Sequence, residues 1–146
     1  MHIFLDSSVL LSFCRSKKGA SALILDYCRA GKLVGFISQK VILEVRKNND
    51  EDGNKLGTLR FLGILKQNFL VIVEDAQKKE EQNAYEVTKN KKDAIIFATA
   101  KSIIHIAFLL SFDNGFFKQE VKAFLKPIEV LKPGEFVNRF REKLEG

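Results

Sequence analysis

The sequence predicts an α/β fold, a three-layer α/β/α sandwich around a central, mostly parallel sheet of about five strands. Short runs of continuous rather than alternating apolar residues recur along the chain, which is typical of strands buried on both faces. Segments of helical length and periodicity separate these runs, and such alternation favours crossover connections. The length of 146 residues fits one domain, over residues 1–146, with a sizeable core.

The expected strands are rich in Ile, Val, Leu and Phe, and they are Ile3–Leu5, Val34–Ile37, Phe69–Val73, Ala107–Phe112 and Ile128–Leu131. Apolar periodicity predicts helices over Ala20–Ala30, Gln39–Asn48, Leu56–Asn68, Gln77–Thr88 and Asp93–Ile103. The first of these ends at Gly31, a suitable C-terminal cap. The last is apolar nearly all round, which indicates a buried central helix. The polar stretch Lys47–Lys55 predicts an exposed loop.

Composition narrows the class of protein. Thirteen Phe and no Trp favour a Phe-packed core rather than a base-stacking surface. Cys14 and Cys28 have no zinc-ligand spacing, so we expect two free thiols. No apolar segment is long enough to cross a membrane, and the first residues lack a signal-peptide pattern, so we expect a cytoplasmic protein. The net charge of +6 favours a polyanionic partner such as nucleic acid.

Four carboxylates stand out by their position. Asp6 and Asp113 each follow an expected strand, and parallel strands end at one edge of the sheet. Glu44 lies within an apolar helical segment, and Asp93 opens the most apolar helix. Taken singly, Asp6 fits a turn, Glu44 a solvated helix face and Asp93 a helix cap. Buried carboxylates are rare unless they are paired or bind a metal, so together the four indicate a site.

These acids fall in motifs that resemble the PIN domain family over nearly the whole chain. Ile3–Leu10 is similar to the first motif, a strand that ends in Asp and is followed by a hydroxyl residue. Glu44 matches the second acid, and Asp93–Ala100 resembles the third motif, an Asp that opens an apolar helix. Ser111–Phe116 is similar to the fourth motif, a Ser or Thr followed by Asp and then an aromatic. Ile128–Phe136 resembles the usual end of these domains.

The resemblance implies a metal-dependent endoribonuclease whose catalytic, metal-ligating residues are Asp6, Glu44, Asp93 and Asp113. Ser7 and Ser111 would support them by orienting carboxylates or contacting phosphate. A site made only of oxygen ligands suits Mg²⁺ or Mn²⁺. One or two such ions would activate water and hold the phosphate. Asn114 stands where some members carry a further acid, which leaves the number of ions open.

Other catalytic chemistries find less support in the residues. The only two histidines, His2 and His105, lie in apolar contexts where we expect packed side chains. Neither glycine pattern of a nucleotide-binding loop occurs. Cations close to the acidic motifs are the candidates for RNA binding, although each could equally be a solvated lysine or arginine: Lys89, Lys91, Lys92, Arg15, Lys17, Lys18, Arg46 and Lys47.

Two alternative functions stay open at this stage. One is a catalytically silent PIN-like module that binds nucleic acid or acts as a scaffold. The other is an aspartate-based phosphotransfer domain, although Ser8 stands where the phosphatase pattern has a second Asp. Among PIN domains, a chain this short most resembles the toxin of a type II toxin–antitoxin pair. That resemblance implies an RNA substrate, an antitoxin protein as partner and a homodimer.

Overall fold

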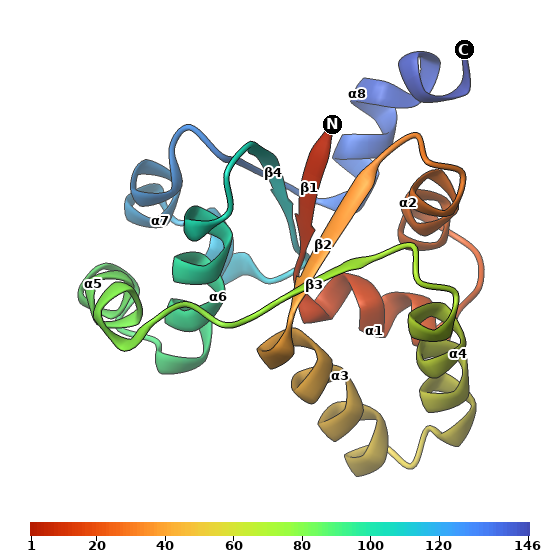
Figure 1. Cartoon of the computed structure of the whole chain (residues 1–146), viewed down its shortest axis with the longest axis horizontal. Helices are drawn as coiled ribbons and strands as arrows, with labels where there is room; N and C mark the ends of the chain where they lie inside the picture. The colour runs from red at the N-terminus through yellow and green to blue at the C-terminus, as the bar shows by residue number, and fades with distance from the viewer.

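The structure, a computed structural model, describes all 146 residues and has a parallel sheet at its centre (Figure 1). The strand order is β3-β2-β1-β4-β5, and each neighbouring pair is parallel. The strands are β1 (His2–Leu5), β2 (Val34–Ser38), β3 (Val71–Val73), β4 (Ile106–Leu110) and β5 (Glu129–Leu131). The sequence therefore predicted all five strands to within a few residues. They are recognisable because the inner strands are covered on both faces.

Helices cover both faces of the sheet. In Figure 1, α5, α6 and α7 lie on one side, while α1, α2 and α4 lie on the other and α3 lies below the carboxyl ends of the strands. The helices are α1 (Ser7–Arg15), α2 (Ala20–Arg29), α3 (Gln39–Glu51), α4 (Lys55–Lys66), α5 (Lys78–Thr88), α6 (Lys91–Ser102), α7 (Gln119–Leu125) and α8 (Pro133–Glu145), with a 3₁₀ turn, η1 (Asn114–Phe117). The predicted α/β/α sandwich is confirmed.

The core is packed with phenylalanine, as the composition indicated. The largest fully buried side chains include Phe4 on the central strand and Phe61, Phe97, Phe116 and Phe136 on the surrounding elements. Phe97 and Phe116 meet edge to face, with their ring centroids 4.6 Å apart. Because Phe has no polar atom to satisfy, these rings fill the space between helices and sheet without needing hydrogen bonds. Both cysteines are buried and free, as expected.

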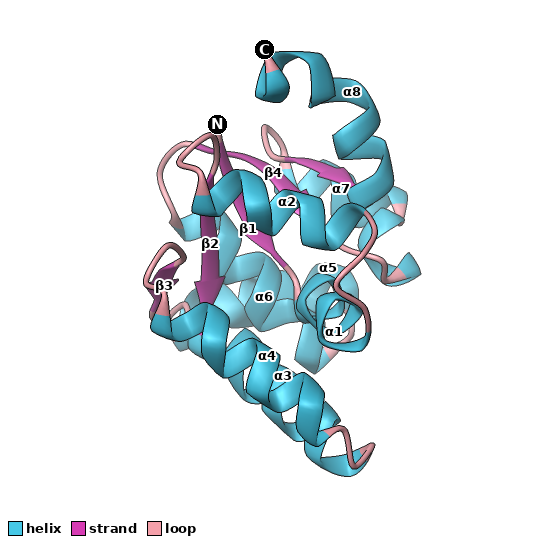
Figure 2. Cartoon of the chain, turned by 90° about the vertical axis from the view of Figure 1, so that its right-hand side faces the viewer, coloured by secondary structure: helices cyan, strands magenta, loops and turns pink.

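The expected loop at Lys47–Lys55 is wrong over most of its length. Helix α3 runs on to Glu51, and only three residues separate it from α4, as Figure 2 shows at the lower edge of the molecule. The polar residues occupy the solvent side of the helix, where Lys47 and Glu51 form an ion pair one turn apart. Asn49 is buried and donates to Cys14 Sγ at 3.4 Å. A contact with a residue this distant in sequence leaves no local pattern.

Three helices had no counterpart among the sequence expectations. Helix α1 begins directly after Asp6, so no polar linker separates it from β1. Helix α7 is short, with seven residues. Helix α8 did carry a usable signal, because Pro133 stands at its start and the Glu135 side chain accepts from the Lys132 backbone N–H. Proline in the first turn and a glutamate that caps it are typical of helix starts.

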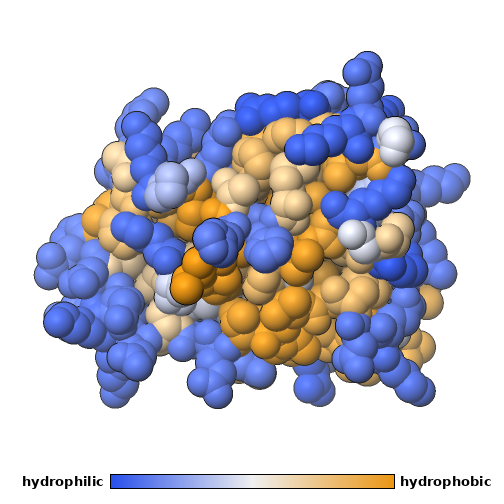
Figure 3. Space-filling model, turned by 45° about the horizontal axis from the view of Figure 1, so that its top comes forward, coloured by the Kyte–Doolittle hydropathy of each residue, from blue (hydrophilic) through white to orange (hydrophobic).

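Some large apolar side chains remain at the surface, and Figure 3 shows apolar atoms gathered among hydrophilic ones on one face of the molecule. The exposed aliphatic residues lie mainly on α3, α4 and the edge strand β3, and they are Leu43, Leu56, Leu59, Leu62, Val71, Ile72 and Ile104. No helix in the structure is both long and apolar enough to cross a membrane.

Gly35 on β2 gives a test of this packing. A Cβ at this position would lie 2.8 Å from Leu70 Cδ2 and 3.0 Å from Cys28 Sγ, both buried. We expect Gly35→Ala to lower the free energy of unfolding by about 1–3 kcal/mol through overpacking. Gly63→Ala is the matched control, because its Cβ meets nothing within 4 Å and Gly63 lies inside α4. It should stabilise the helix by up to about 1 kcal/mol. Urea unfolding that ranked the two variants the other way would contradict this packing.

Candidate active site

Asp6 lies at the carboxyl end of the central strand, where it directly precedes α1. Its side chain is almost fully buried. Its backbone N–H donates to the Leu110 carbonyl at 3.0 Å, which extends the pairing of β1 with β4 by one residue. Two hydroxyls, those of Ser8 and Ser111, donate to Asp6 Oδ2 at 2.8 Å each. A buried carboxylate is costly unless it is hydrogen-bonded, and these serines meet that need.

The same serines fix the segment that follows β4. The Asp113 backbone N–H donates to Ser111 Oγ at 2.9 Å, and the Phe112 N–H donates to Ser8 Oγ at 3.0 Å. The Gly115 N–H in turn donates to Asp113 Oδ1 at 2.8 Å. The chain after β4 is therefore tied to the start of α1 by side-chain hydroxyls. Asp113 is held beside Asp6 as a result.

Glu44 and Asp93 come from two helices, α3 and α6. Glu44 Oε2 accepts from Ser7 Oγ at 2.8 Å, which joins α3 to α1. Asp93 stands in the first turn of α6, where the Asn90 side chain accepts from the Asp93 backbone N–H at 3.1 Å. A Cβ added to Gly115 would lie 3.3 Å from Asp93 Oδ2 and 3.2 Å from Asp113 Oδ1. Glycine at 115 thus lets two carboxylates approach the same point.

The four sequence-predicted acids line one cavity of about 250 Å³. It lies at the edge of the sheet where the parallel strands end, because Asp6, which directly follows β1, and Asp113, which follows β4, both line it. Its lining is almost entirely polar and comprises Asp6, Ser7, Ser8, Leu11, Lys40, Glu44, Lys47, Asn48, Glu51, Lys92, Asp93 and Asp113. The four acids come from four separate parts of the chain, so the fold itself assembles this cluster.

The sequence model of the PIN domain family matches residues 2–115, a span that contains all four acids. The chain belongs to the PIN domain family. Among curated protein sequences, none matches it.

Solved structures with the same fold are distant in sequence. PAE2754 from Pyrobaculum aerophilum is 14% identical with a TM-score of 0.66, covering 97% of this chain and 90% of that one. The sarcin-ricin loop cleaving toxin VapC20 from Mycobacterium tuberculosis is 19% identical with a TM-score of 0.58, covering 79% and 92%. VapBC2 from Rickettsia felis, bound to a DNA fragment from its promoter, is 11% identical with a TM-score of 0.64, covering 90% and 98%. At these identities the likeness concerns the fold.

The surroundings of this PIN domain cavity disfavour the ionised form of three of its four acids. Burial raises the pKa of Asp6, although hydrogen bonds from Ser111 and Ser8 offset part of the effect. Burial also raises the pKa of Glu44, and the charge of Asp6 adds to that rise. The pKa of Asp93 rises to about 6, first because of burial and then because of the neighbouring charges of Asp113, Asp6 and Glu44. A cation between these groups would relieve the repulsion.

The donor set fits a hard divalent cation, although no three acidic, histidine or cysteine side chains form a ready-made coordination cluster. The available ligands are carboxylate, hydroxyl and amide oxygens, the set that Mg²⁺ and Mn²⁺ prefer. The cavity of about 250 Å³ has room for a cation with several of its waters, since a water occupies about 30 Å³ in the liquid. Mg²⁺ usually keeps several waters when protein binds it. Asp6, Glu44, Asp93 and Asp113 are therefore suited to hold an ion partly through water.

Two of the eight candidate RNA-binding residues line the cavity, Lys47 and Lys92. Lys40 lines it as well and was missed in the sequence, as were Ser8 and Asn48. A signal was available, because Lys40, Lys47 and Asn48 lie four residues before and three and four residues after Glu44. Residues at these spacings share one face of a helix. The positive charges of Lys40 and Lys92 lower the pKa of Glu44 and so oppose part of its rise.

The other six candidate cations lie outside the cavity lining. Arg15 pairs with Asp52 at 3.5 Å. Lys17 borders a different hollow between α1, α2 and α4. Lys89 lies over the Tyr85 ring, and Lys91 lines a groove beside α5. Lys18 and Arg46 are exposed.

The histidines also lie away from the cavity. His2 is half-buried against Phe36, with ring centroids 5.3 Å apart, as the packed interpretation expected. His105 is exposed in the turn before β4 with a φ of 71°, so the expectation of a packed side chain was wrong there. The neighbouring apolar residues belong to the strand and do not enclose the turn.

Asp93 generates a pH prediction for the metal-free protein. Its folded pKa of about 6 exceeds the ordinary value, so the folded state binds the proton more tightly than the unfolded state does. The stability this provides is complete below the ordinary pKa near 3.8 and is lost as pH rises through about 6. Asp93→Asn should flatten the fall in melting temperature between about pH 4 and pH 7. Glu142→Gln, an exposed acid on α8, should keep the parent's slope. A melting temperature of Asp93→Asn below that of the parent near neutral pH would contradict the repulsion between Asp93 and the neighbouring acids.

Proposed function

We propose that this PIN domain is a Mg²⁺- or Mn²⁺-dependent endoribonuclease that acts in the cytoplasm. The observation that carries the proposal is the convergence of Asp6, Glu44, Asp93 and Asp113 on one cavity at the carboxyl edge of the sheet. Two like charges about 4 Å apart repel by roughly 4 kcal/mol at an effective dielectric near 20. A fold that keeps four such carboxylates together needs something that offsets their repulsion. A bound cation would offset it.

In this mechanism the chain's own residues orient the reacting groups. Bound metal would acidify a water and offset charge on the scissile phosphate. Ser8 and Ser111 hold the Asp6 carboxylate in one orientation. Hydrolysis adds the water oxygen to phosphorus and breaks the bond to one ribose oxygen, which takes up a proton as it leaves. We assign the acceptance of the water's proton to Glu44, because Ser7 orients one of its oxygens and burial raises its pKa.

Three lysines at the cavity suit the phosphates next to the scissile bond. Lys40 and Lys47 come from α3 and Lys92 from α6, so cations stand on two sides of the acids. In this proposal the negatively charged acids bind the metal cation, and the positively charged lysines bind the RNA phosphates. A catalytically silent nucleic-acid module would still bind RNA through the lysines but would not cleave it. Cleavage assays therefore distinguish the two.

Within the PIN family we propose the role of a toxin of a toxin–antitoxin pair. The support is the shared fold with VapC20, described as a sarcin-ricin loop cleaving toxin, and with VapBC2. An antitoxin protein and a second copy of this chain are the partners we propose. Exposed Leu43, Leu56 and Leu59 on α3 and α4 support a protein contact there, because apolar patches at a surface commonly mark interfaces.

The metal requirement can be tested directly. The purified chain should cleave single-stranded RNA with Mg²⁺ or Mn²⁺, and EDTA should abolish this cleavage. Asp113→Asn should reduce the rate by at least about 100-fold, because losing even an outer partner of a metal site costs up to that much. It should also shrink the rise in melting temperature that Mn²⁺ gives the parent. Asp50→Asn, an exposed acid of α3 outside the cavity, serves as control. Full cleavage in EDTA would refute the mechanism.

The lysines allow a separate test of substrate binding. Replacing Lys40, Lys47 and Lys92 together by Ala should weaken RNA binding and flatten its salt dependence. The log–log slope should fall by about 0.7 for each lost contact with a single strand. A triple variant at exposed lysines elsewhere, Lys55, Lys66 and Lys143, should keep the parent's slope. Equal slopes in all three proteins would mean that the cavity lysines do not contact phosphate.

A further inference from the structure

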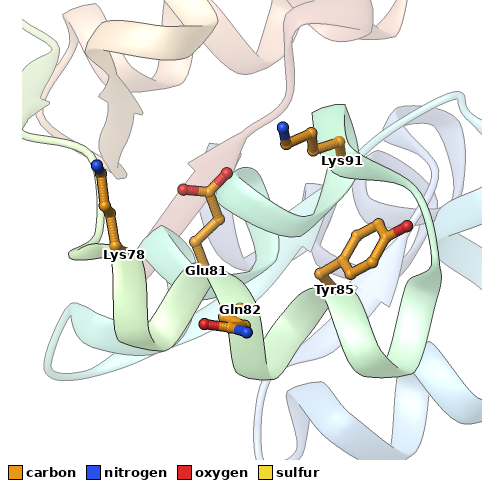
Figure 4. Close-up of a pocket in the computed structure, with 5 residues that line it drawn as sticks. All are labelled: Lys78, Glu81, Gln82, Tyr85 and Lys91. Atoms are coloured by element: carbon orange, nitrogen blue, oxygen red, sulfur yellow. The ribbon is translucent and has the colours of Figure 1, made fainter.

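A second hollow lies beside the acidic cavity, between α5 and the start of α6 (Figure 4). It is an open groove of about 610 Å³ lined by Lys78, Glu81, Gln82, Tyr85 and Lys91. The side chains of Lys78 and Glu81 rise from α5 into this space, and Lys91 stands at its far border. Ligand pockets of roughly this size for small molecules are lined mostly by apolar side chains. Here the only aromatic or apolar lining residue is a tyrosine.

Tyr85 is an exposed aromatic residue on a face of α5 that otherwise carries charged side chains. Lys78, Glu81 and Tyr85 follow one another at helical spacing, so they form a single stripe along the helix. The Tyr85 side chain is 41% exposed, whereas the adjacent Ala84 is fully buried and anchors the helix. Lys89 Nζ lies 5.9 Å from the centroid of the Tyr85 ring. An exposed ring with cations around it is the combination that binds single-stranded nucleic acid.

Two consecutive residues link the groove to the acidic cavity. Lys92 lines the cavity, and Lys91, its neighbour in the first turn of α6, lines the groove. Their Cα atoms are about 3.8 Å apart, as in any trans peptide. A polyanion that leaves the cavity past Lys92 therefore meets Lys91 next and then the Tyr85 ring. Both hollows are lined mainly by polar residues, with one hydrophobic residue in each, Leu11 in the cavity and Tyr85 in the groove.

We propose that this groove binds the nucleotides that flank the scissile phosphate, an inference that rests on the proposed nuclease function. One base stacks on Tyr85, and phosphates contact Lys78 and Lys91. Glu81 forms no ion pair within the structure and can accept a hydrogen bond from a base amino group. Because α5 also carries Glu80 and Glu86, stacking contributes more to affinity here than charge does. The groove thus extends the substrate contact beyond the catalytic centre.

The experiment measures RNA affinity in an Asp113→Asn background, where the oligomer stays intact. Oligomers of about 4 and about 12 nucleotides span the range of single-strand sites. Tyr85→Ala should weaken binding of the longer oligomer by about 5- to 150-fold, the equivalent of losing one stacked base. Tyr85→Phe keeps the ring and should stay within about twofold of the background protein. Lys79→Ala, next to Lys78 but outside the groove lining, is the matched control.

Two outcomes overturn the assignment in distinguishable ways. If the parent cleaves RNA but Tyr85→Ala binds the longer oligomer as tightly as Tyr85→Phe does, the groove is not a nucleotide site and the nuclease function stands. If the parent neither binds nor cleaves RNA, the proposed function fails and the groove assignment fails with it. Photocrosslinking of thiouridine-labelled RNA to the otherwise unaltered chain adds a readout that needs no variant at Tyr85. A crosslink at Tyr85 supports the proposal, and crosslinks confined to other elements refute it.

Discussion

The burial of one carboxylate, Asp6, at the end of the central strand is the constraint on which the site depends. A buried charge costs several kcal/mol unless hydrogen bonds replace the lost water. The donors are Ser8, in the first turn of α1, and Ser111, directly after β4. Both serines also accept from backbone N–H groups of the segment that carries Asp113. Satisfying one carboxylate therefore fixes where a second one lies.

The cost of that arrangement is electrostatic: the pKa values of Asp6, Glu44 and Asp93 are all raised. The Asp93 pKa of about 6 means that near neutral pH the folded chain holds a charge that it would more easily hold when unfolded. Natural proteins tolerate such strain where function requires it. The chain as a whole has a net charge of +6, yet the only basic residues that line the cavity are Lys40, Lys47 and Lys92. Repulsion among the acids therefore remains, as the raised pKa of Asp93 indicates.

The sequence predicted the features that depend on local chemistry or on the sheet as a whole. Continuous apolar runs predicted the strands, and the shared edge of parallel strands predicted that Asp6 and Asp113 would lie together. What it did not predict depends on contacts between distant residues. Helix α3 extends because Asn49 is buried against Cys14, and the phase of each helix decides which lysines face the cavity. The catalytic roles of the acids are proposed from their convergence.

The first turn of α6 shows how one short segment serves several requirements. Successive residues of a helix point about 100° apart, so Lys91, Lys92 and Asp93 face the groove, the cavity rim and the acid cluster in turn. One turn deeper, Phe97 packs edge to face against Phe116, which stands three residues after Asp113. This apolar contact holds together the two segments whose carboxylates repel each other. The aromatic pair thus opposes the electrostatic strain, and the spacing of Asp93 from Asp113 is set in the core rather than at the surface.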